Sequence, residues 1–581
     1  RRFQERSMQN YYNEDDTGVV YKDVVVVGNG PSGICLSYML AGNWPYYTGE
    51  PHPGDEMLTA RLHFSTRPSG EESTAMANGN RGEGIESRRP GRFETCPGPG
   101  PGPGPGPGPE TRAQGGRGLA RSTRWNLECL SSGLEGRGGG RPLALLMDQL
   151  QHPCVDAGLD VPSLLTWRSR EQHPEHKVID HVVLGKGEPG GAWQSMDPNV
   201  LTISLNRWMS LPDLDIRHWE SLVESEQLRK TISSEGDSCT LVGPQEMLNS
   251  CKTASRIPVG IVAAYYKDYV RRKGLEQYFR CGTVVTSVRS TSVRSDDEYG
   301  WIVEGYEIKT GKPFRYRCKR AVLATGTTDL SNHLGIPGEN SQPDWVTHDL
   351  NYLESRLDRL VDQKADKLDE QTKPVLVVGA GLSAADAIMA ARFRGIPVLH
   401  TFRDSSTEWN KRNTEKIRMR YDRLQWLPSS MYPEYHKVYE MMADGGTNYP
   451  LYRALPGYTL VRIETNDSRF GVHSDRGKVV VLSSPDGQLH RFCVSVVAIL
   501  IGYKPDLSYL SDNGIGLGRI SEKPIDNKSN PIDIDDFTYE VSKAPRKGLY
   551  ALGPLVGDNF VRFILGGAFG ILAHILSTSN T

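Results

Sequence analysis

The chain has 581 residues, a length typical of about two to four domains. Lys and Arg number 68 and Asp and Glu number 70, so a formal net charge of −2 excludes a global field that attracts nucleic acid or an anionic membrane. The nine cysteines are scattered and form no C-x-x-C pair, which argues against a disulfide framework and a zinc site, and we predict no metal site. No secretory leader is recognised and the most apolar stretch, 563–576, is too short to span a bilayer, so we expect a cytoplasmic protein, with the nucleus or division structures as further locations.

A strand, a glycine-rich turn and a helix are predicted near the start of the chain. The apolar run Val24–Val27 is typical of a strand buried on both faces. It is followed by GNGPSG (28–33) and then by ICLSYMLAG, in which apolar residues recur at helical spacing. Residues 1–20 are predicted to be a flexible lead-in.

Residues 46–126 predict a disordered insertion within a domain. They are rich in Gly, Pro, Arg, Ser and Glu, and 97–109 is a strict Pro-Gly alternation. A composition of this kind does not supply enough apolar surface for a packed core.

A second strand, turn and helix is predicted at 374–395, followed by a strand at 396–403. The sequence therefore predicts an α/β protein with two Rossmann-like dinucleotide-binding domains. We expect a discontinuous FAD domain (21–45, 127–370 and 490–581) with an NADPH domain inserted at 371–489.

The first turn fits the G-x-G-x-x-G pattern with Gly28, Gly30 and Gly33. The glycines permit a tight turn, close approach of a pyrophosphate and close helix packing, while Pro31 and Ser32 start a helix whose N-terminus attracts phosphate. The alternative is a purely structural turn. The acid that usually binds the ribose is missing, because the next predicted strand ends in Leu184-Gly185-Lys186.

The second turn, Gly379 to Ala384, contains Gly381 and Ser383 and has the G-x-G-x-x-A form. Its following strand ends in Arg403 rather than in an acid. A guanidinium can bind a 2′-phosphate, which favours NADPH over NADH, although a solvated strand end is the simpler alternative.

Two dinucleotide sites in one chain suggest FAD and NADPH, with hydride passing from the nicotinamide to the flavin. A disulfide reductase needs a close cysteine pair, and the sequence has none. Dioxygen or a small acceptor is then the expected electron acceptor.

Several sequence boxes resemble known flavoproteins. GNGPSG, PGGAW (189–193), VLATGT (322–327) and GAGLSAADA are similar to the flavin-containing and N-hydroxylating monooxygenases. LSSGLEGR (130–137), MYPEYHKVY (431–439), NPIDIDDFTY (530–539) and LGPLVGDNFVRF (552–563) resemble, more closely, the oxidative stress-induced growth inhibitor family.

The resemblance implies an FAD-dependent, NADPH-using monooxygenase-like protein linked to cell growth, differentiation, cell death and cell division. Carried over by position, it implies further flavin contacts at Gly190, Gly191, Trp193, Thr325, Gly326, Gly557 and Asp558. One box departs from the flavin-containing monooxygenases, since His348 is present but Gln342 and Asp344 replace its Phe and Gly.

The expected substrate is a small molecule or protein with a soft nitrogen or sulfur nucleophile. Asn206 is a candidate catalytic residue, with a turn-forming role as the alternative. Two other functions remain open. One is a regulatory scaffold that keeps the flavoprotein fold without turnover, and the other is an amine N-hydroxylase.

Overall fold

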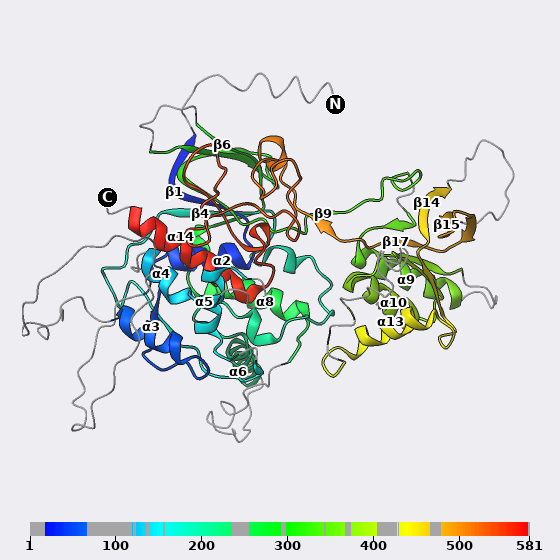
Figure 1. Ribbon diagram of the computed structural model, residues 1–581, viewed down its shortest axis with the longest axis horizontal. Coiled ribbons are helices and arrows are strands. Elements are labelled where there is room, and N and C mark those ends of the chain that lie inside the picture. The colour runs from blue at the N-terminus through cyan, green and yellow to red at the C-terminus, as the bar shows by residue number, and fades with distance from the viewer. Residues whose placement is uncertain are drawn as a thin grey trace, which may run out of the picture.

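The computed structural model describes the chain at 18–66, 119, 124–134, 140–154, 157–234, 255–291, 298–341, 344–365, 373–403, 424, 427, 429–464 and 478–578. Figure 1 shows two α/β units side by side. The larger unit holds both ends of the described chain, and the smaller one holds α9, α10 and α13. This arrangement confirms the predicted fold class of two doubly wound units in one chain.

The first unit is built on a sheet of seven strands among the described residues, in the order β5-β4-β1-β8-β7-β6 with β19 beside β8. Its strands are β1 (Val19–Val27), β4 (His181–Gly185), β5 (Phe279–Cys281), β6 (Thr283–Ser290), β7 (Trp301–Glu307), β8 (Pro313–Leu323) and β19 (Leu549–Ala551). Strands β5, β4, β1, β8 and β19 run parallel, so the loops after β1, β4, β8 and β19 meet at one edge of the sheet.

The centre of this sheet is apolar because helices cover it. Val24–Val27 are at most 3% exposed. The covering helix α2 (Pro31–Leu40) packs against α14 (Ile564–Thr578), which also packs against α5 (Pro142–Gln151). By length and composition, Val561–Thr578 is the single candidate membrane span among the described residues, and 67% of it is buried inside the protein.

The remaining helices of the first unit surround this core. They are α3 (Glu56–Thr66), α4 (Arg124–Ser131), α6 (Ile216–Ser234) and α8 (Val259–Arg272). A two-stranded sheet, β2 (Trp44–Tyr47) and β3 (Leu165–Arg168), lies beside them.

The predicted insertion begins later than the sequence suggests. Residues 46–66 belong to the fold, since they complete β2 and form α3, and Leu58 and Leu62 are fully buried. The prediction of disorder from residue 46 is therefore wrong for this part. Leu58 and Leu62, at (i, i+4) spacing, give α3 one buried apolar face. Most of the remaining insertion lies outside the described residues.

The second unit is built on a parallel sheet in the order β10-β17-β11-β12-β13. Its strands are β10 (Val346–Thr347), β17 (Val497–Ile499), β11 (Val375–Val378), β12 (Val398–Phe402) and β13 (Tyr452–Pro456). Helices α9 (Leu350–Ala365), α10 (Leu382–Phe393) and α13 (Pro433–Asp444) accompany it, together with an antiparallel sheet of β14 (Thr459–Glu464), β15 (Val479–Ser483) and β16 (Leu489–Cys493).

The sheet of the second unit includes strands from both sides of the predicted 371–489 range. β10 precedes that range, and β17 follows it although residues 490–581 are predicted to belong to the FAD domain. A short buried apolar strand reveals its burial but not which of two sheets it joins. Between the units, β9 (Leu330–Ser331) pairs with β18 (Tyr503–Lys504), so the outgoing and returning chain segments run together (Figure 1).

Two candidate dinucleotide sites

The first glycine turn is fixed by backbone packing at two positions and open at the third. Gly28 has φ +118°, and a Cβ there would overlap the Ala324 carbonyl oxygen. A Cβ at Gly33 would overlap the Gly28 carbonyl oxygen. A Cβ at Gly30, in contrast, would have no heavy atom within 4 Å. Gly28 and Gly33 are therefore required by the fold, whereas Gly30 leaves space for a ligand.

Two other loops, those after β4 and β19, close around this turn. The Gly190 N–H donates to the Asn29 carbonyl at 2.9 Å, and a Cβ at Gly191 would lie 3.0 Å from Gly30 Cα. On the opposite side, a Cβ at Gly553 would lie 2.5 Å from Ser32 Oγ. Helix α2 begins after Gly30 without a side-chain cap. Its first-turn N–H groups and the surrounding glycines thus form a small polar cradle suited to an anion.

Asn29 explains why the usual ribose-binding acid is absent. Its Nδ2 donates to the Gly187 carbonyl at 2.7 Å, and its amide occupies the space where a Cβ of Gly185 would stand. A carboxylate side chain at Gly185 would collide with this amide. The next residue, Lys186, lies 3.5 Å from an Asp506 carboxylate oxygen and 3.9 Å from one of Asp329.

Thr325 and Asp558 reach this region from the loops after β8 and β19. Thr325 Oγ1 is hydrogen-bonded to the Tyr509 hydroxyl at 3.0 Å. Asp558 is 4% exposed and accepts a hydrogen bond from the Tyr539 hydroxyl at 2.8 Å. Burial raises the pKa of Asp558 to about 6, against the opposing effects of Arg141 and Tyr539. Hydrogen bonds to Tyr509 and Tyr539 therefore fix the orientations of the Thr325 and Asp558 side chains.

The other predicted flavin residues take different positions. Gly326 and Gly557 both have positive φ, +73° and +96°, and turn the chain directly after β8 and η7 (Gly553–Val556). Trp193 packs edge-to-face on Tyr266, with ring centroids 6.0 Å apart. Contact of any of these residues with a nucleotide stays a prediction.

Asn206 lies in a short 3-10 helix, Asn206–Met209, and is fully buried. Its Oδ1 accepts from the backbone N–H of Arg207 at 2.8 Å and of Ser255 at 3.3 Å. These bonds fit the turn-forming alternative, and its catalytic role stays a prediction.

The second glycine turn repeats the construction of the first. Gly28 N–H donates to the carbonyl of Leu184 on the neighbouring strand, and Gly379 N–H donates to that of Thr401. Gly379 has φ +132°, and a Cβ there would overlap the carbonyl oxygen of Leu500, just after β17. A Cβ at Gly381 would again meet nothing within 4 Å.

Helix α10 starts after Gly381 without a side-chain cap, as α2 does after Gly30. Ser383 is half-buried in its first turn, and Ala384 is 1% exposed. The two turns therefore have the same tight entry, the same open second glycine and the same uncapped helix start.

The His400 side chain fixes the backbone of the second turn through a hydrogen bond to Gly379. Its Nε2 lies 2.6 Å from the Gly379 carbonyl oxygen, which can only accept, so Nε2 carries the proton and Nδ1 accepts from the Tyr452 hydroxyl at 2.8 Å. Burial lowers the pKa of His400 to about 4, although the bond to Gly379 acts in the opposite direction. The imidazole is therefore neutral at physiological pH.

Arg403 stands one residue beyond β12, the strand beside β11, and is exposed. It occupies the position from which a side chain reaches the ribose of a nucleotide on the neighbouring turn. The basic stretch 411–423 lies outside the described residues.

Sequence reasoning missed four residues that shape the two sites: Asn29, His400, Tyr509 and Tyr539. Only Asn29 had a local signal, because it lies inside the glycine motif. The other three meet their partners across 19 to 184 positions of sequence, and no local pattern encodes such pairs.

The fold and the paired turns define a protein with two Rossmann-type dinucleotide-binding units. The chain is 35% identical to oxidative stress-induced growth inhibitor 1 of Mus musculus over 95% of both chains, and 34% identical to oxidative stress-induced growth inhibitor 2 of Homo sapiens over 96% of this chain and 93% of that one. The chain belongs to the oxidative stress-induced growth inhibitor family. No family model matches it.

Solved structures give a more distant likeness. An ornithine hydroxylase from Pseudomonas aeruginosa is 12% identical with a TM-score of 0.45, covering 71% of this chain and 95% of that one. A flavin monooxygenase from Stenotrophomonas maltophilia is 13% identical with a TM-score of 0.44, covering 97% and 100%.

Proposed function

We propose that this protein binds FAD at the first glycine turn and NADPH at the second, and is an NADPH-dependent oxidoreductase of the flavin monooxygenase type. The observation that carries the proposal is the identical construction of the two turns. In each, the first glycine is forced by packing and the second faces open space. A structural turn gives no reason for an open glycine at the start of an uncapped helix in both units.

FAD is assigned to the first turn because its surroundings suit a long dinucleotide. Loops after four parallel strands converge there, and they include the close approach of Gly191 to Gly30 and of Gly553 to Ser32. In this assignment, first-turn N–H groups of α2 hold the pyrophosphate, and Asp558, oriented by Tyr539, accepts from a flavin hydroxyl.

NADPH is assigned to the second turn because of Arg403. The position after β12 holds an exposed guanidinium in place of a carboxylate. A guanidinium attracts a 2′-phosphate, whereas an acid accepts from a ribose 2′-hydroxyl.

Bound FAD would take hydride from NADPH and react with dioxygen, delivering oxygen to a soft nitrogen or sulfur nucleophile. The chain's own contribution is to bind and orient both nucleotides and to keep water from the flavin. An amine N-hydroxylase is one form of this reaction. From the names of its relatives, we further propose a part in growth restraint under oxidative stress. A cytoplasmic location is proposed from the sequence alone.

The test is spectroscopic and kinetic. The purified full chain, supplied with FAD, is expected to be yellow and to oxidise NADPH faster than free flavin does. Arg403→Ala is expected to raise the KM for NADPH by about tenfold or more while kcat, flavin content and the KM for NADH change little, since only the 2′-phosphate contact is lost. A colourless protein, or NADPH consumption no faster than that of free flavin, would sink the enzyme proposal.

A regulatory scaffold is the second candidate function. It is favoured because the Asn29 amide occupies the space that a side chain at Gly185 would need. Without a ribose-binding acid on β4, nucleotide binding depends on fewer contacts. A protein that binds FAD yet consumes no NADPH, with growth control retained in the Arg403→Ala variant, would support this scaffold.

A further inference from the structure

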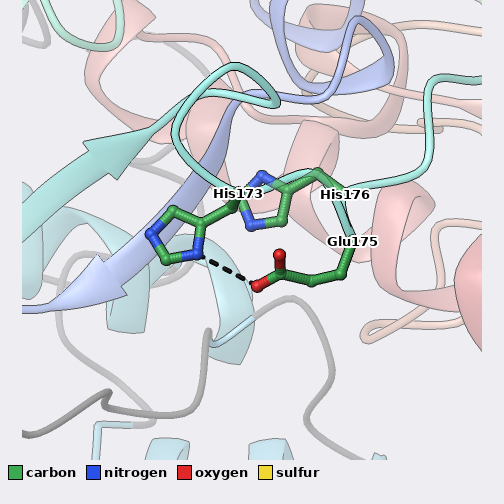
Figure 2. Close-up of side chains that lie close together, drawn as sticks. All are labelled: His173, Glu175 and His176. Carbon is green, nitrogen blue, oxygen red and sulfur yellow. Dashed lines mark hydrogen bonds and ion pairs between the residues drawn. The ribbon is translucent and has the colours of Figure 1, made fainter.

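Among the described residues, two separate clusters each bring two histidines and one glutamate together. The clusters differ in whether the imidazole nitrogens are already used in hydrogen bonds to the rest of the fold. Figure 2 shows the first, in which His173 faces Glu175 at 3.0 Å beside His176. His176 Nδ1 donates to the Gly42 carbonyl at 2.9 Å, and Nε2 accepts from the Tyr46 hydroxyl at 2.8 Å. Both nitrogens of His176 thus serve the fold, so this group is not a metal site.

The second group consists of His333, Glu339 and His348. Glu339 Oε1 lies 2.8 Å from His348 Nε2 and 3.4 Å from His333 Nδ1. The three ligand atoms all lie within 4.8 Å of one another, and the two rings are 4.0 Å apart at their centroids. One oxygen and two imidazole nitrogens therefore lie close enough together to bind a single ion.

Backbone hydrogen bonds hold the Glu339 carboxylate in one orientation. Its Oε1 accepts from the Leu334 N–H at 3.0 Å, and its Oε2 accepts from Gly335 at 2.8 Å and Ile336 at 3.3 Å. The Glu339 side chain is fully buried. Hydrogen-bonded carboxylates of this kind are common in metal centres, where the outer partners fix the ligand.

Exposure increases from Glu339 to His348 and then to His333. The His348 side chain is 14% exposed and that of His333 is 45% exposed. An ion can therefore enter from the His333 side, and a water molecule can complete its coordination there. A deeply buried group without such a side would have no entry path.

We propose that His333, Glu339 and His348 bind one Zn²⁺ ion. Two imidazoles and one carboxylate are a known zinc ligand set, with water in the fourth position. Mg²⁺ and Ca²⁺ prefer all-oxygen ligands and are not expected. A ligating imidazole nitrogen must be unprotonated, so any proton on it moves to the other ring nitrogen or to solvent on binding.

The position of the site gives the ion a structural role. His333 follows β9, and His348 follows β10, so the three ligands span the segment that leads from the first unit into the second. A bound ion would tie this segment to the edge of the second sheet. This role depends on neither nucleotide and is independent of the proposed function.

The search for cysteine pairs in the sequence could not reveal this cluster, because the cluster contains no cysteine. The spacings of six and nine residues follow no helix or strand period. The irregular segment 332–336 and the turn that follows it at 337–341 bring the side chains together.

The test uses the full chain without an affinity tag, stripped of metal and titrated with Zn²⁺ against a chromogenic chelator. One Zn²⁺ per chain is expected, and Co²⁺ is expected to give the visible absorption of a four-coordinate site. His333→Asn is the main variant, because its exposed side chain can be replaced without unfolding the protein. Loss of a ligand is expected to weaken Zn²⁺ binding by more than the 10–100-fold typical of losing an outer partner.

His348→Asn is expected to weaken Zn²⁺ binding in the same way as His333→Asn. His173→Asn is the matched control from the first group and is expected to bind Zn²⁺ as the wild type does. The proposal is overturned if the stripped wild type takes no Zn²⁺ from the chelator. It is also overturned if His333→Asn and His348→Asn bind Zn²⁺ as tightly as His173→Asn does.

Discussion

At the residue scale, the glycines of one motif are needed for different reasons, some for backbone packing and others for ligand space. Gly28 and Gly33 are required by neighbouring backbone, whereas Gly30 and Gly381 are bordered by open space. Gly30 and Gly381 also have negative φ values, −71° and −91°, which any L-residue can adopt. Structure and ligand binding can therefore be separated by substitution within a single turn.

Gly30→Val is expected to leave a folded protein that binds no FAD, because the new side chain fills only the space left for phosphate. Gly28→Ala is expected to lower the free energy of unfolding by at least about 1–3 kcal/mol, since φ is +118° and the Cβ overlaps Ala324. Flavin absorbance and urea unfolding distinguish the two variants. A yellow Gly30→Val protein would contradict the assignment of the first site.

The neutral imidazole of His400 makes stability depend on pH. Its pKa is lowered to about 4 by burial, so the unfolded chain takes up a proton near pH 6.5 and the folded chain does not. Stability therefore falls as the pH falls between these values. From pH 7 to pH 5, the wild type is expected to lose about 2 kcal/mol more than His400→Gln in urea unfolding. Parallel losses in both proteins would show that His400 is not held neutral.

At the element scale, Arg256 connects the first unit to the N-terminal end of α13. Arg256 donates from Nε to the Thr202 carbonyl at 2.7 Å and pairs with Glu434 at 2.5 Å. Its guanidinium also lies 4.6 Å from the centre of the Tyr432 ring. Because α13 packs against α10, this contact connects the first unit to the helix of the second glycine turn.

Arg256→Ala is expected to lower the free energy of unfolding by about 1.5–3 kcal/mol, the range for hydrogen bonds to a charged group. Amide hydrogen exchange in α13 is expected to accelerate, with β1 unchanged. Arg256→Lys is the matched control, which retains charge but loses the planar fork. Unchanged exchange in α13 would show that the contact does not fasten it.

Helix α3 lies in a segment whose composition predicted disorder, so nothing in that composition indicated this helix. A disordered segment would tolerate any substitution, but Leu58 is fully buried. Leu58→Ala is therefore expected to lower the free energy of unfolding by about 2–5 kcal/mol. An exposed neighbour, Met57→Ala, is the control and is expected to change it little. Equal stability of the two variants would restore the disordered interpretation of 46–66.

Local patterns predicted the strands and turns but not the partners they meet. The run Val24–Val27 and the glycines after it predicted β1, the turn and α2, because burial and tight turning are encoded in neighbouring residues. The sheet joined by β17, the amide of Asn29 above Gly185 and the meeting of His333 with His348 depend on contacts between distant segments. Such contacts leave no period in the sequence.

At the scale of the whole molecule, two units of like construction are joined by chain segments that pair at β9 and β18. Each unit has the turn of a nucleotide site, and electron transfer requires the two nucleotides to meet. The central claim is therefore that NADPH bound by the second unit reduces FAD bound by the first.

Anaerobic mixing of the FAD-loaded protein with NADPH tests this claim most directly, with flavin absorbance as the readout. The account predicts that the wild type loses its flavin absorbance rapidly. It predicts that Gly381→Val, which fills only open space at the second turn, keeps its flavin but is not reduced. Flavin that stays oxidised in the wild type, or reduction at the same rate in Gly381→Val, would contradict the account.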